Sequence, residues 1–270
     1  MANRIFKDGI IGGASGGLPA EVDAMLVQRA RGLVRHYGRA ATCWQILHPV
    51  LSLWFSASGD GVVGYVTYRR VRVAAGEPVC APERLAAVCR EFAQDAAGVG
   101  ERVCYLAAEY PLVQELNGAG EHAVMPIGAQ PVWHPSDLSR VFAKTGALRY
   151  QLNRARNKGL SVAEWPAQKS SHPTLQRCLA SWLDSKPLPA LGFMTDPYLL
   201  QRMDGRRLWV AEQEGRIAGY TVLAPVPTRK GWLVEQIVCG RKAPNGTAES
   251  LVAAAAQAVA GDGSKFFTLG

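Results

Sequence analysis

The spacing of apolar residues divides the first half of the chain into helices and short strands. Apolar residues recur at helical spacing from about Pro19 to about His36, and Gly38 then ends the pattern. A second helix is predicted from about Pro82 to about Ala97. The other predicted elements are strands at Cys43–Leu47, Leu51–Ser56, Val62–Tyr68, Val71–Ala74, Arg102–Ala108 and Ala123–Trp133, and a short helix at Pro111–Asn117. This order favours an α/β domain over residues 19–134.

The second half repeats this mixture of helices and strands. The predicted elements are helices at Thr174–Ser185, Pro197–Met203 and Thr247–Ala260, and strands at Leu208–Gln213, Ile217–Leu223, Trp232–Cys239 and Lys265–Leu269. They favour a second α/β domain over residues 161–270. The similar element order suggests a duplicated fold, although no residue-level repeat supports one. The glycine-rich residues 1–18 lack the GxxxxGK[ST] spacing of a phosphate-binding loop and are predicted to be a flexible leader.

Between the two halves, residues 135–160 form the most cationic segment, which is predicted to be a basic linking helix. On a helix that starts near Gly146, Leu148, Leu152 and Ala155 form an apolar stripe. The other side of this helix carries cationic and amide groups, from Arg149, Asn153, Arg154 and Lys158. Such a face is typical of a surface that contacts phosphate groups, and also of an ordinary solvated helix.

Charge and cysteine content narrow the class of protein. The formal net charge of +8 favours a polyanionic partner such as nucleic acid or anionic lipid, unless the charge is evenly spread. The six cysteines form no CxxC pair and the five histidines no HxxxH pair, so we expect reduced core cysteines, a cytoplasmic protein and no metal site. No apolar run reaches the length of a membrane span, and the N-terminus lacks a signal-peptide pattern.

The stretch Gly231–Leu251 combines a strand, a cationic turn and the start of a helix. Glu235 lies inside the apolar strand, and the turn carries Arg241 and Lys242. Asn245 and Glu249 flank the start of the following alanine-rich helix. A helix N-terminus beside a cationic turn offers a place for an anionic or carbonyl group. The stretch therefore predicts a ligand site in the second domain.

Short motifs along the chain resemble the soluble C-terminal domain of phosphatidylglycerol lysyltransferases from about residue 28 onward. The motifs are Leu148–Arg154 with Gly159, Leu191–Phe193 with Pro197–Leu199, Ala243–Gly246 with Glu249 and Leu251, and upstream Trp54–Ser56, Gly64–Tyr65, Gly76–Pro78 and Ile127–Gly128. The resemblance implies two tandem acetyltransferase-like (GNAT-type) domains joined by a basic helix. It also implies an aminoacyl-tRNA as donor and a hydroxyl acceptor, which is the glycerol of phosphatidylglycerol in characterised relatives. For this chain we expect an anionic phospholipid or another hydroxyl acceptor, with peripheral contact at the inner face of the membrane.

The sequence departs from the pattern of this family at three places. The relatives carry Asp where Glu235 stands and Arg where Val238 stands. They also continue with a basic segment beyond the position of Gly270, so we expect the C-terminal domain to be truncated. Without the arginine, Arg241 or Lys242 would have to contact a substrate phosphate.

Glu235 is the candidate catalytic residue. It is expected to accept a proton from the acceptor hydroxyl or to hold the amino group of the aminoacyl moiety, and the alternative is a carboxylate exposed at a sheet edge. The candidate substrate-binding residues are Arg149, Asn153, Arg154, Lys158, Arg241, Lys242, Asn245 and Glu249. Among these, Glu249 has an alternative role in stabilising the helix dipole, and Asn245 one as a helix cap. No cofactor is expected, because the tRNA ester is already activated and positioning supplies most of the catalysis.

Two other classes of function fit the same fold class. An acyl-CoA-dependent N-acyltransferase normally needs a glycine-rich loop after the central strand, but here Pro244 stands where the first glycine is expected. A non-catalytic module that binds tRNA or an anionic membrane is the second alternative, favoured if Val238 and the shortened end abolish turnover.

Overall fold

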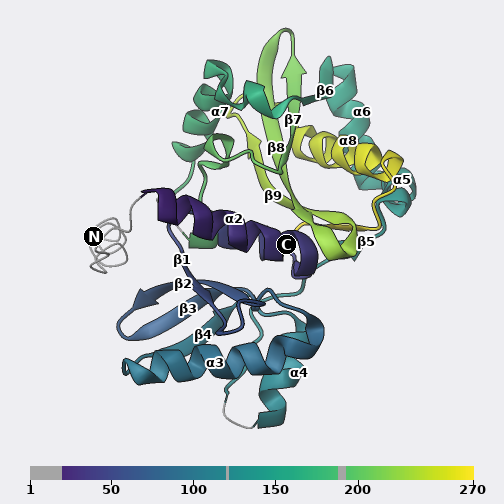
Figure 1. Cartoon of the computed structure of the whole chain (residues 1–270). Helices are drawn as coiled ribbons and strands as arrows, with labels where there is room; N and C mark the ends of the chain where they lie inside the picture. Colours follow the sequence, from purple (N-terminus) through teal and green to yellow (C-terminus); the bar gives the residue numbers. More distant parts are fainter. Residues whose placement is uncertain (1–19, 120–121, 188–192) are drawn as a thin grey trace. The chain divides into compact units, whose positions relative to one another are not determined.

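The computed structural model describes residues 20–119, 122–187 and 193–270, so the predicted leader lies outside the described residues. The chain forms two compact units, the first built mainly from residues up to Ala129 and the second mainly from Gln130 onward. The domain limits 19–134, 135–160 and 161–270 stay a prediction. Figure 1 shows the helices and strands of each unit with the labels used below.

The first unit is a four-stranded sheet covered by helices. Its strand order is β1-β2-β3-β4, with β1, β2 and β3 antiparallel and β4 parallel to β3. The helix α3 joins β3 to β4, as a parallel crossover requires. The elements are α2 Ala20–Tyr37, η1 Cys43–Leu47, β1 Ser52–Phe55, β2 Val62–Tyr68, β3 Val71–Ala75, η2 Pro82–Arg84, α3 Leu85–Gly98, β4 Arg102–Leu106 and α4 Tyr110–Ala119.

The second unit is a six-stranded sheet in the order β5-β10-β9-β8-β7-β6. The strands β9 and β10 are parallel and α8 connects them, whereas β6, β7 and β8 pair antiparallel. Its helices and strands are β5 Val132–Trp133, α5 Pro135–Lys144, α6 Gly146–Asn157, β6 Leu160–Trp165, α7 Pro173–Leu183, β7 Arg207–Gln213, β8 Arg216–Val226, β9 Gly231–Cys239, α8 Thr247–Gly261 and β10 Phe266–Thr268. Its short turns of 3-10 helix are η3 Ala167–Ser171 and η5 Leu199–Gln201, whereas most residues of η4 Phe193–Thr195 and η6 Pro227–Arg229 belong to the first unit.

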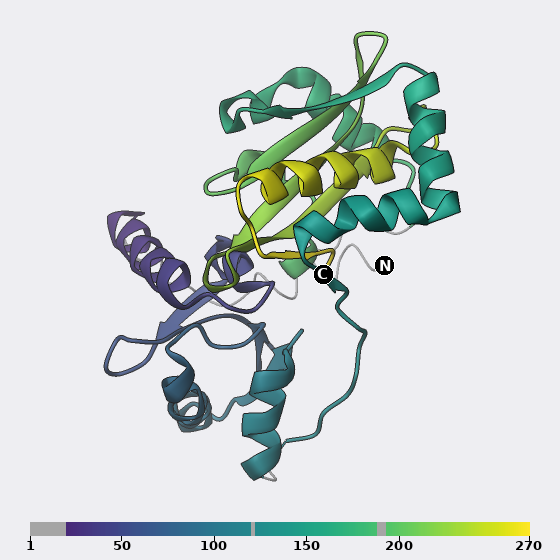
Figure 2. The same ribbon diagram turned by 90° about the vertical axis from the view of Figure 1, so that its right-hand side faces the viewer.

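Helices cover both faces of this second sheet, as Figures 1 and 2 show. Along β7, Trp209 and Ala211 pack with α5, α6 and α8 in one core cluster. The alternate residues Leu208 and Val210 pack with α7 and η5 in a second cluster. Because successive side chains of a strand point to opposite faces, the two clusters define an α8 face and an α7 face of the sheet.

Several predicted elements are corrected by the structure. Cys43–Leu47 forms the 3-10 helix η1 instead of a strand, because a short run of buried apolar residues does not distinguish the two. Of the predicted strand Ala123–Trp133, only Val132–Trp133 pairs with a neighbour. Of the predicted helix Pro197–Met203, only the 3-10 turn η5 forms. The basic segment forms two helices, α5 and α6, and the edge strand β6 after them was not predicted.

The α6 helix packs directly against the turn that precedes α8. Gly246 has a φ of +94°, and an added Cβ would lie 2.2 Å from the backbone oxygen of Gln151 and 3.1 Å from the Cβ of Ala155. Only glycine tolerates both the left-handed backbone and this close approach. Gly246 therefore fixes the cationic helix α6 against the N-terminus of α8.

We predict that Gly246→Ala destabilises the second unit by about 1–3 kcal/mol from backbone conformation alone, with a further cost from the contact with Gln151. Gly261→Ala, at the other end of the same helix, is the control because an added Cβ meets nothing within 4 Å. It is expected to leave stability unchanged or to raise it by up to about 1 kcal/mol. Urea unfolding of both variants checks this, and equal stability of the two would contradict the packing of α6 on Gly246.

Candidate functional site

The carboxylate of Glu235 lies in a buried ion pair at the centre of the second sheet. Arg206 donates to both of its oxygens, with Nε 2.6 Å from Oε2 and Nη2 3.0 Å from Oε1. The side chains are 8% exposed for Arg206 and 3% for Glu235. The strand β9 lies between β10 and β8, so the alternative of an exposed carboxylate at a sheet edge is wrong. Two lone-pair positions of the carboxylate remain for a ligand after this bidentate contact.

A second arginine reinforces the positive charge around Glu235. Arg202 pairs with Asp196, and its pKa is lowered by burial and next by the nearby Arg206 guanidinium. Arg206 also donates to the backbone oxygen of Arg202 at 3.0 Å. These groups come from residues 196–206, of which Leu199, Leu200 and Met203 pack in the core cluster of the α7 face. The site is therefore a partly desolvated cluster of two guanidinium and two carboxylate groups.

The strand β9 is irregular next to Glu235. Val234 and Ile237, three residues apart, both contact the core cluster of the α8 face, whereas strict alternation would place them on opposite faces. One step of alternation is thus lost at Glu235 and Gln236, as in a β-bulge, and bulges commonly re-aim side chains beside active sites. The amide of Gln236 donates to the backbone oxygen of Pro197 at 2.7 Å. Both consecutive side chains therefore bond to residues of the segment after α7.

Among the buried polar atoms that have no hydrogen-bond partner within the described residues, two belong to the neighbouring strands β8 and β9. They are the side-chain oxygen of Gln236 and the hydroxyl of Tyr220. Tyr220 belongs to the core cluster of the α7 face, and burial raises the pKa of its hydroxyl. Because buried polar groups are normally satisfied, such atoms mark positions where a ligand or water can bond.

The end of β9 brings further polar groups together. The pKa of the Cys239 thiol is raised to about 11, chiefly by burial and then by Cys178 and Glu249, while Lys186 acts to lower it. Glu249 therefore lies within electrostatic reach of Cys239, half-buried in the first turn of α8. Its carboxylate makes no hydrogen bond or ion pair within the described part of the chain. Gly246, not Asn245, holds the N-cap position of α8, so the alternative role of Asn245 as a cap is wrong.

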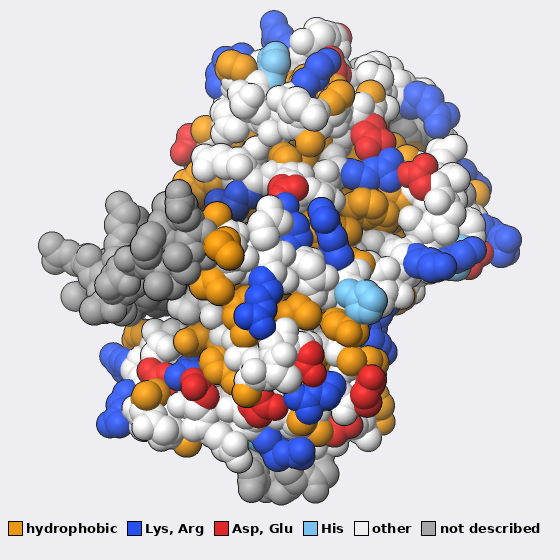
Figure 3. Space-filling model, viewed as in Figure 1, with side chains coloured by type: hydrophobic (Ala, Val, Ile, Leu, Met, Phe, Trp, Pro, Cys, Tyr) orange, Lys and Arg blue, Asp and Glu red, His pale blue; other side chains and the backbone are white. Residues whose placement is uncertain are grey.

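The predicted cations lie mostly at the surface. Arg241 and Lys242 are exposed in the turn after β9, and Val238 is fully buried among apolar side chains. On α6, Arg154 is half-buried, whereas Arg149 and Asn153 are exposed, as is Lys158 directly after this helix. Figure 3 shows Lys and Arg side chains along the edge of the second unit where α5 lies.

The contact of Gln151 and Ala155 with Gly246 places α6 beside the turn that ends at Asn245. Within the described part of the chain, neither α6 nor this turn has a hydrogen bond or ion pair with Glu235. Arg149 donates to the backbone oxygen of Ala143 at 3.1 Å, which ties α6 to α5. The predicted site residues therefore divide into a buried carboxylate within the sheet and an exposed cationic surface around the start of α8.

Comparison with known proteins identifies the family of the chain. The family described as "Phosphatidylglycerol lysyltransferase, C-terminal" matches residues 31–270. The chain belongs to this family. The resemblance noted in the sequence is thereby confirmed. An uncharacterised protein of Corynebacterium glutamicum is 24% identical over 218 residues, which are 72% of this chain and 27% of the relative. The chain thus spans about a quarter of the length of this curated relative.

Solved structures confirm the fold. The C-terminal domain of a candidate lysylphosphatidylglycerol synthetase from Agrobacterium fabrum superposes with a TM-score of 0.81 at 21% identity, covering 92% of this chain and 79% of that chain. The structure of L-PGS from Bacillus licheniformis gives 0.75 at 18% identity, covering 90% and 75%. The predicted α/β architecture is confirmed.

In this family member, sequence reasoning missed several residues of the site. Arg206 and Arg202 carry no local signal, because their role depends on a loop that returns to β9. Tyr220 lies inside the predicted strand Ile217–Leu223, and the sequence gives no sign of a role for it in the site. Gln236 lies beside Glu235 in the printed sequence, and two consecutive polar residues in an apolar strand are a signal that was available.

In the described residues, no helix is long and apolar enough to span a bilayer, and no group of three or more His, Cys, Asp or Glu residues could hold a metal.

We predict that Arg206→Met destabilises the protein by about 3–5 kcal/mol, because it leaves the Glu235 carboxylate buried without its partner. Its sequence neighbour provides the control. Arg207 contacts Glu164 and Asp262 in a more exposed network, and Arg207→Met is expected to cost about 1 kcal/mol or less. Chemical unfolding of both variants measures the difference, and similar costs would show that the Glu235 pair is not desolvated.

Proposed function

We propose that this protein is an aminoacyltransferase that moves an amino acid from aminoacyl-tRNA to a hydroxyl acceptor, phosphatidylglycerol or a related lipid. Membership of the phosphatidylglycerol lysyltransferase family supports a transferase of this kind. The single observation that carries the proposal is the buried Glu235–Arg206 pair beside an irregular central strand. A protein would not retain such a desolvated pair for stability alone, because an apolar pair of similar volume is often as stable.

Acyl transfer from the tRNA ester requires the protein mainly to position the two substrates and to place charged groups beside the reacting atoms. The acceptor hydroxyl attacks the ester carbonyl, the bond from the carbonyl carbon to the 3′ oxygen of the tRNA breaks, and the hydroxyl proton ends on that leaving oxygen. Glu235 is proposed as the catalytic residue, accepting a hydrogen bond from the attacking hydroxyl or from the amino group of the aminoacyl moiety. Arg206 fixes the orientation of the carboxylate through two hydrogen bonds.

The exposed cationic surface is proposed to bind the phosphate groups of the donor and of the lipid. It combines the two cations of the turn, Arg241 and Lys242, with Arg149, Asn153 and Arg154 of α6 and with Lys158, which follows α6. Asn245 and Glu249 would contact the substrate at the start of α8. Clustered cations of this kind bind polyanions with a strong dependence on salt. Peripheral contact with the cytoplasmic face of the membrane belongs to the same proposal.

Acyl-CoA dependence is disfavoured by the turn before α8. Pro244 is buried there and has no backbone N–H, and the packing of Gln151 and Ala155 on Gly246 closes the space beside the helix N-terminus. A pyrophosphate would therefore meet fewer backbone donors than a glycine-rich loop provides.

Transfer of a labelled amino acid tests the proposal. The protein is incubated with a mixture of charged tRNAs and vesicles containing phosphatidylglycerol, and lipid-bound label is measured. We predict label in the lipid with the unchanged protein and a loss of at least about a hundredfold in rate with Glu235→Gln.

Glu164→Gln is the matched control, because Glu164 also accepts two hydrogen bonds from an arginine but lies exposed on an edge strand. It is expected to keep the rate, and circular dichroism verifies that Glu235→Gln remains folded. Transfer from acetyl-CoA with none from any charged tRNA would overturn the proposal.

A further inference from the structure

A pocket of about 310 Å³ lies on the α8 face of the second sheet, away from Glu235. Its walls come from α5, α6, the start of β6 and α8. These helices pack in the core cluster of the α8 face, whereas Arg206, the partner of Glu235, follows η5 on the α7 face. The volume lies within the range of small-molecule sites. The pocket is therefore a separate site, which the proposed acyl-transfer chemistry does not use.

The pocket exists because α8 presents small side chains to α5 and α6. Ala253 and Ala254 form part of its wall, and Ser250 lies one turn earlier on the same helix. The Ser250 hydroxyl donates to the backbone oxygen of Gly246 at 2.7 Å, so its lone pairs remain as acceptors. A leucine at either alanine position would fill the space and pack equally well in a helix. The small side chains of Ala253 and Ala254 therefore leave this space open.

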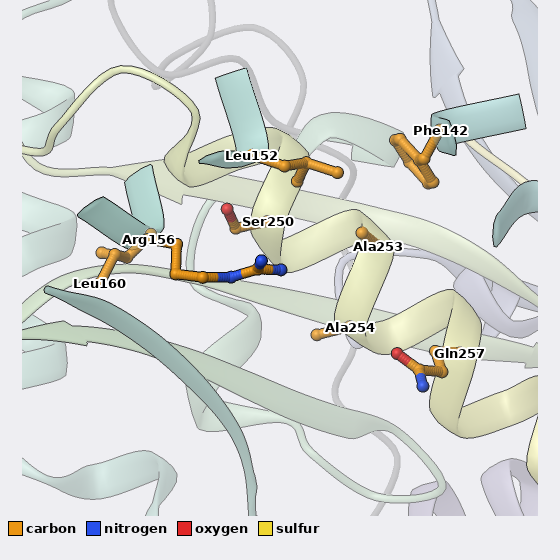
Figure 4. A pocket seen from close by; sticks show the side chains of 8 residues that line it. All are labelled: Phe142, Leu152, Arg156, Leu160, Ser250, Ala253, Ala254 and Gln257. Carbon is orange, nitrogen blue, oxygen red and sulfur yellow. The ribbon is translucent and has the colours of Figure 1, made fainter. Parts of the chain in front are cut away.

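Three polar or aromatic groups converge on this hollow from different elements. Figure 4 shows the Arg156 guanidinium reaching from α6 toward α8, with Phe142 and Gln257 toward the other end. Arg156 is exposed, and its guanidinium makes no ion pair or hydrogen bond with any residue that the structure describes. The Phe142 ring packs in part against the core cluster of the α8 face and has no aromatic partner within the same residues, where the Gln257 amide also makes no hydrogen bond. Each group is available to a ligand.

These groups match the parts of a nucleotide. A free guanidinium binds phosphate, an unstacked aromatic ring stacks on a base, and an amide bonds to the edge of a base. A hydrocarbon chain fits less well, since Arg156, Ser250 and Gln257 make the lining partly polar. The surrounding helices also carry exposed cations, among them Lys144 on α5 and Lys158 after α6, which suit a continuing phosphate backbone.

We propose that this pocket binds one unstacked nucleotide of a single-stranded RNA segment, at a site separate from acyl transfer. The identity of the RNA as the tRNA donor rests on the proposed function. Arg156 contacts the phosphate, Phe142 stacks on the base and Gln257 contacts its edge. The pocket positions the donor and takes no part in the bond changes.

Binding of a fluorescent single-stranded RNA hexamer, followed by anisotropy and by competition with 5′-AMP, tests the inference. We expect Arg156→Gln and Ala253→Leu each to raise the Kd by about tenfold, which corresponds to ~1.4 kcal/mol. Both should also abolish competition by 5′-AMP. Arg177→Gln, an exposed arginine on α7, removes the same charge elsewhere in the unit and is expected to change the Kd by less than about twofold. Thermal unfolding shows whether each variant remains folded.

An unchanged Kd in both pocket variants overturns the inference, and so does displacement by decanoate or lysophosphatidylglycerol where 5′-AMP has no effect. The failure of this inference is distinguishable from that of the proposed function. If the unchanged protein transfers no amino acid while RNA binding depends on Arg156 and Ala253, the pocket stands as an RNA site. If transfer occurs while the substitutions at Arg156 and Ala253 leave the Kd for RNA unchanged, only the pocket inference fails.

Discussion

The buried ion pair between Arg206 and Glu235 is the interaction on which the candidate site in the second unit depends. Removing two charges from water costs several kcal/mol each, and only close, bidentate geometry offsets that cost. The pair satisfies this condition, with both contacts at 3.0 Å or less and both side chains less than a tenth exposed. It joins the loop before β7 to the central strand β9. The loop and the carboxylate therefore hold each other in place.

The irregularity of β9 lies beside this ion pair and determines the direction of the Glu235 and Gln236 side chains. A regular strand would alternate its side chains, but here Val234 and Ile237 reach the same face. Glu235 and Gln236 can then both bond to the segment after α7, to Arg206 and Pro197 respectively. The site thus combines a fixed charge pair with unpartnered polar atoms of Gln236 and Tyr220. Fixed charges in a partly dry setting stabilise developing charge without reorganisation.

Much of the architecture was predictable from the sequence, because strong local periodicity survives in the fold. The helix starting near Gly146 and the strand around Glu235 follow from patterns within one element. The 3-10 helix at Cys43–Leu47 was not predictable, since a five-residue buried run fits either state. The partner of Glu235 was also beyond local reasoning, because Arg206 lies 29 residues away and reaches it only through the fold.

The cationic surface was likewise predictable from the sequence only in part. The arginines and lysines of α5 and α6 are visible in the sequence as a charged segment, and their exposure agrees with that pattern. Their packing against the start of α8 depends on the left-handed Gly246, which the motif Ala243–Gly246 contains without revealing the contact. The pocket around Arg156 depends on alanines of a helix a hundred residues further along the chain, so no local pattern indicates it.

The most direct measurement of the central claim replaces the whole ion pair by the double substitution Arg206→Met with Glu235→Met. If the pair is retained for catalysis, the double variant keeps its unfolding free energy within about 1 kcal/mol or gains stability, because two apolar side chains replace two desolvated charges. Aminoacyl transfer to lipid is then lost in a folded protein. Transfer at the rate of the unchanged protein would contradict the account.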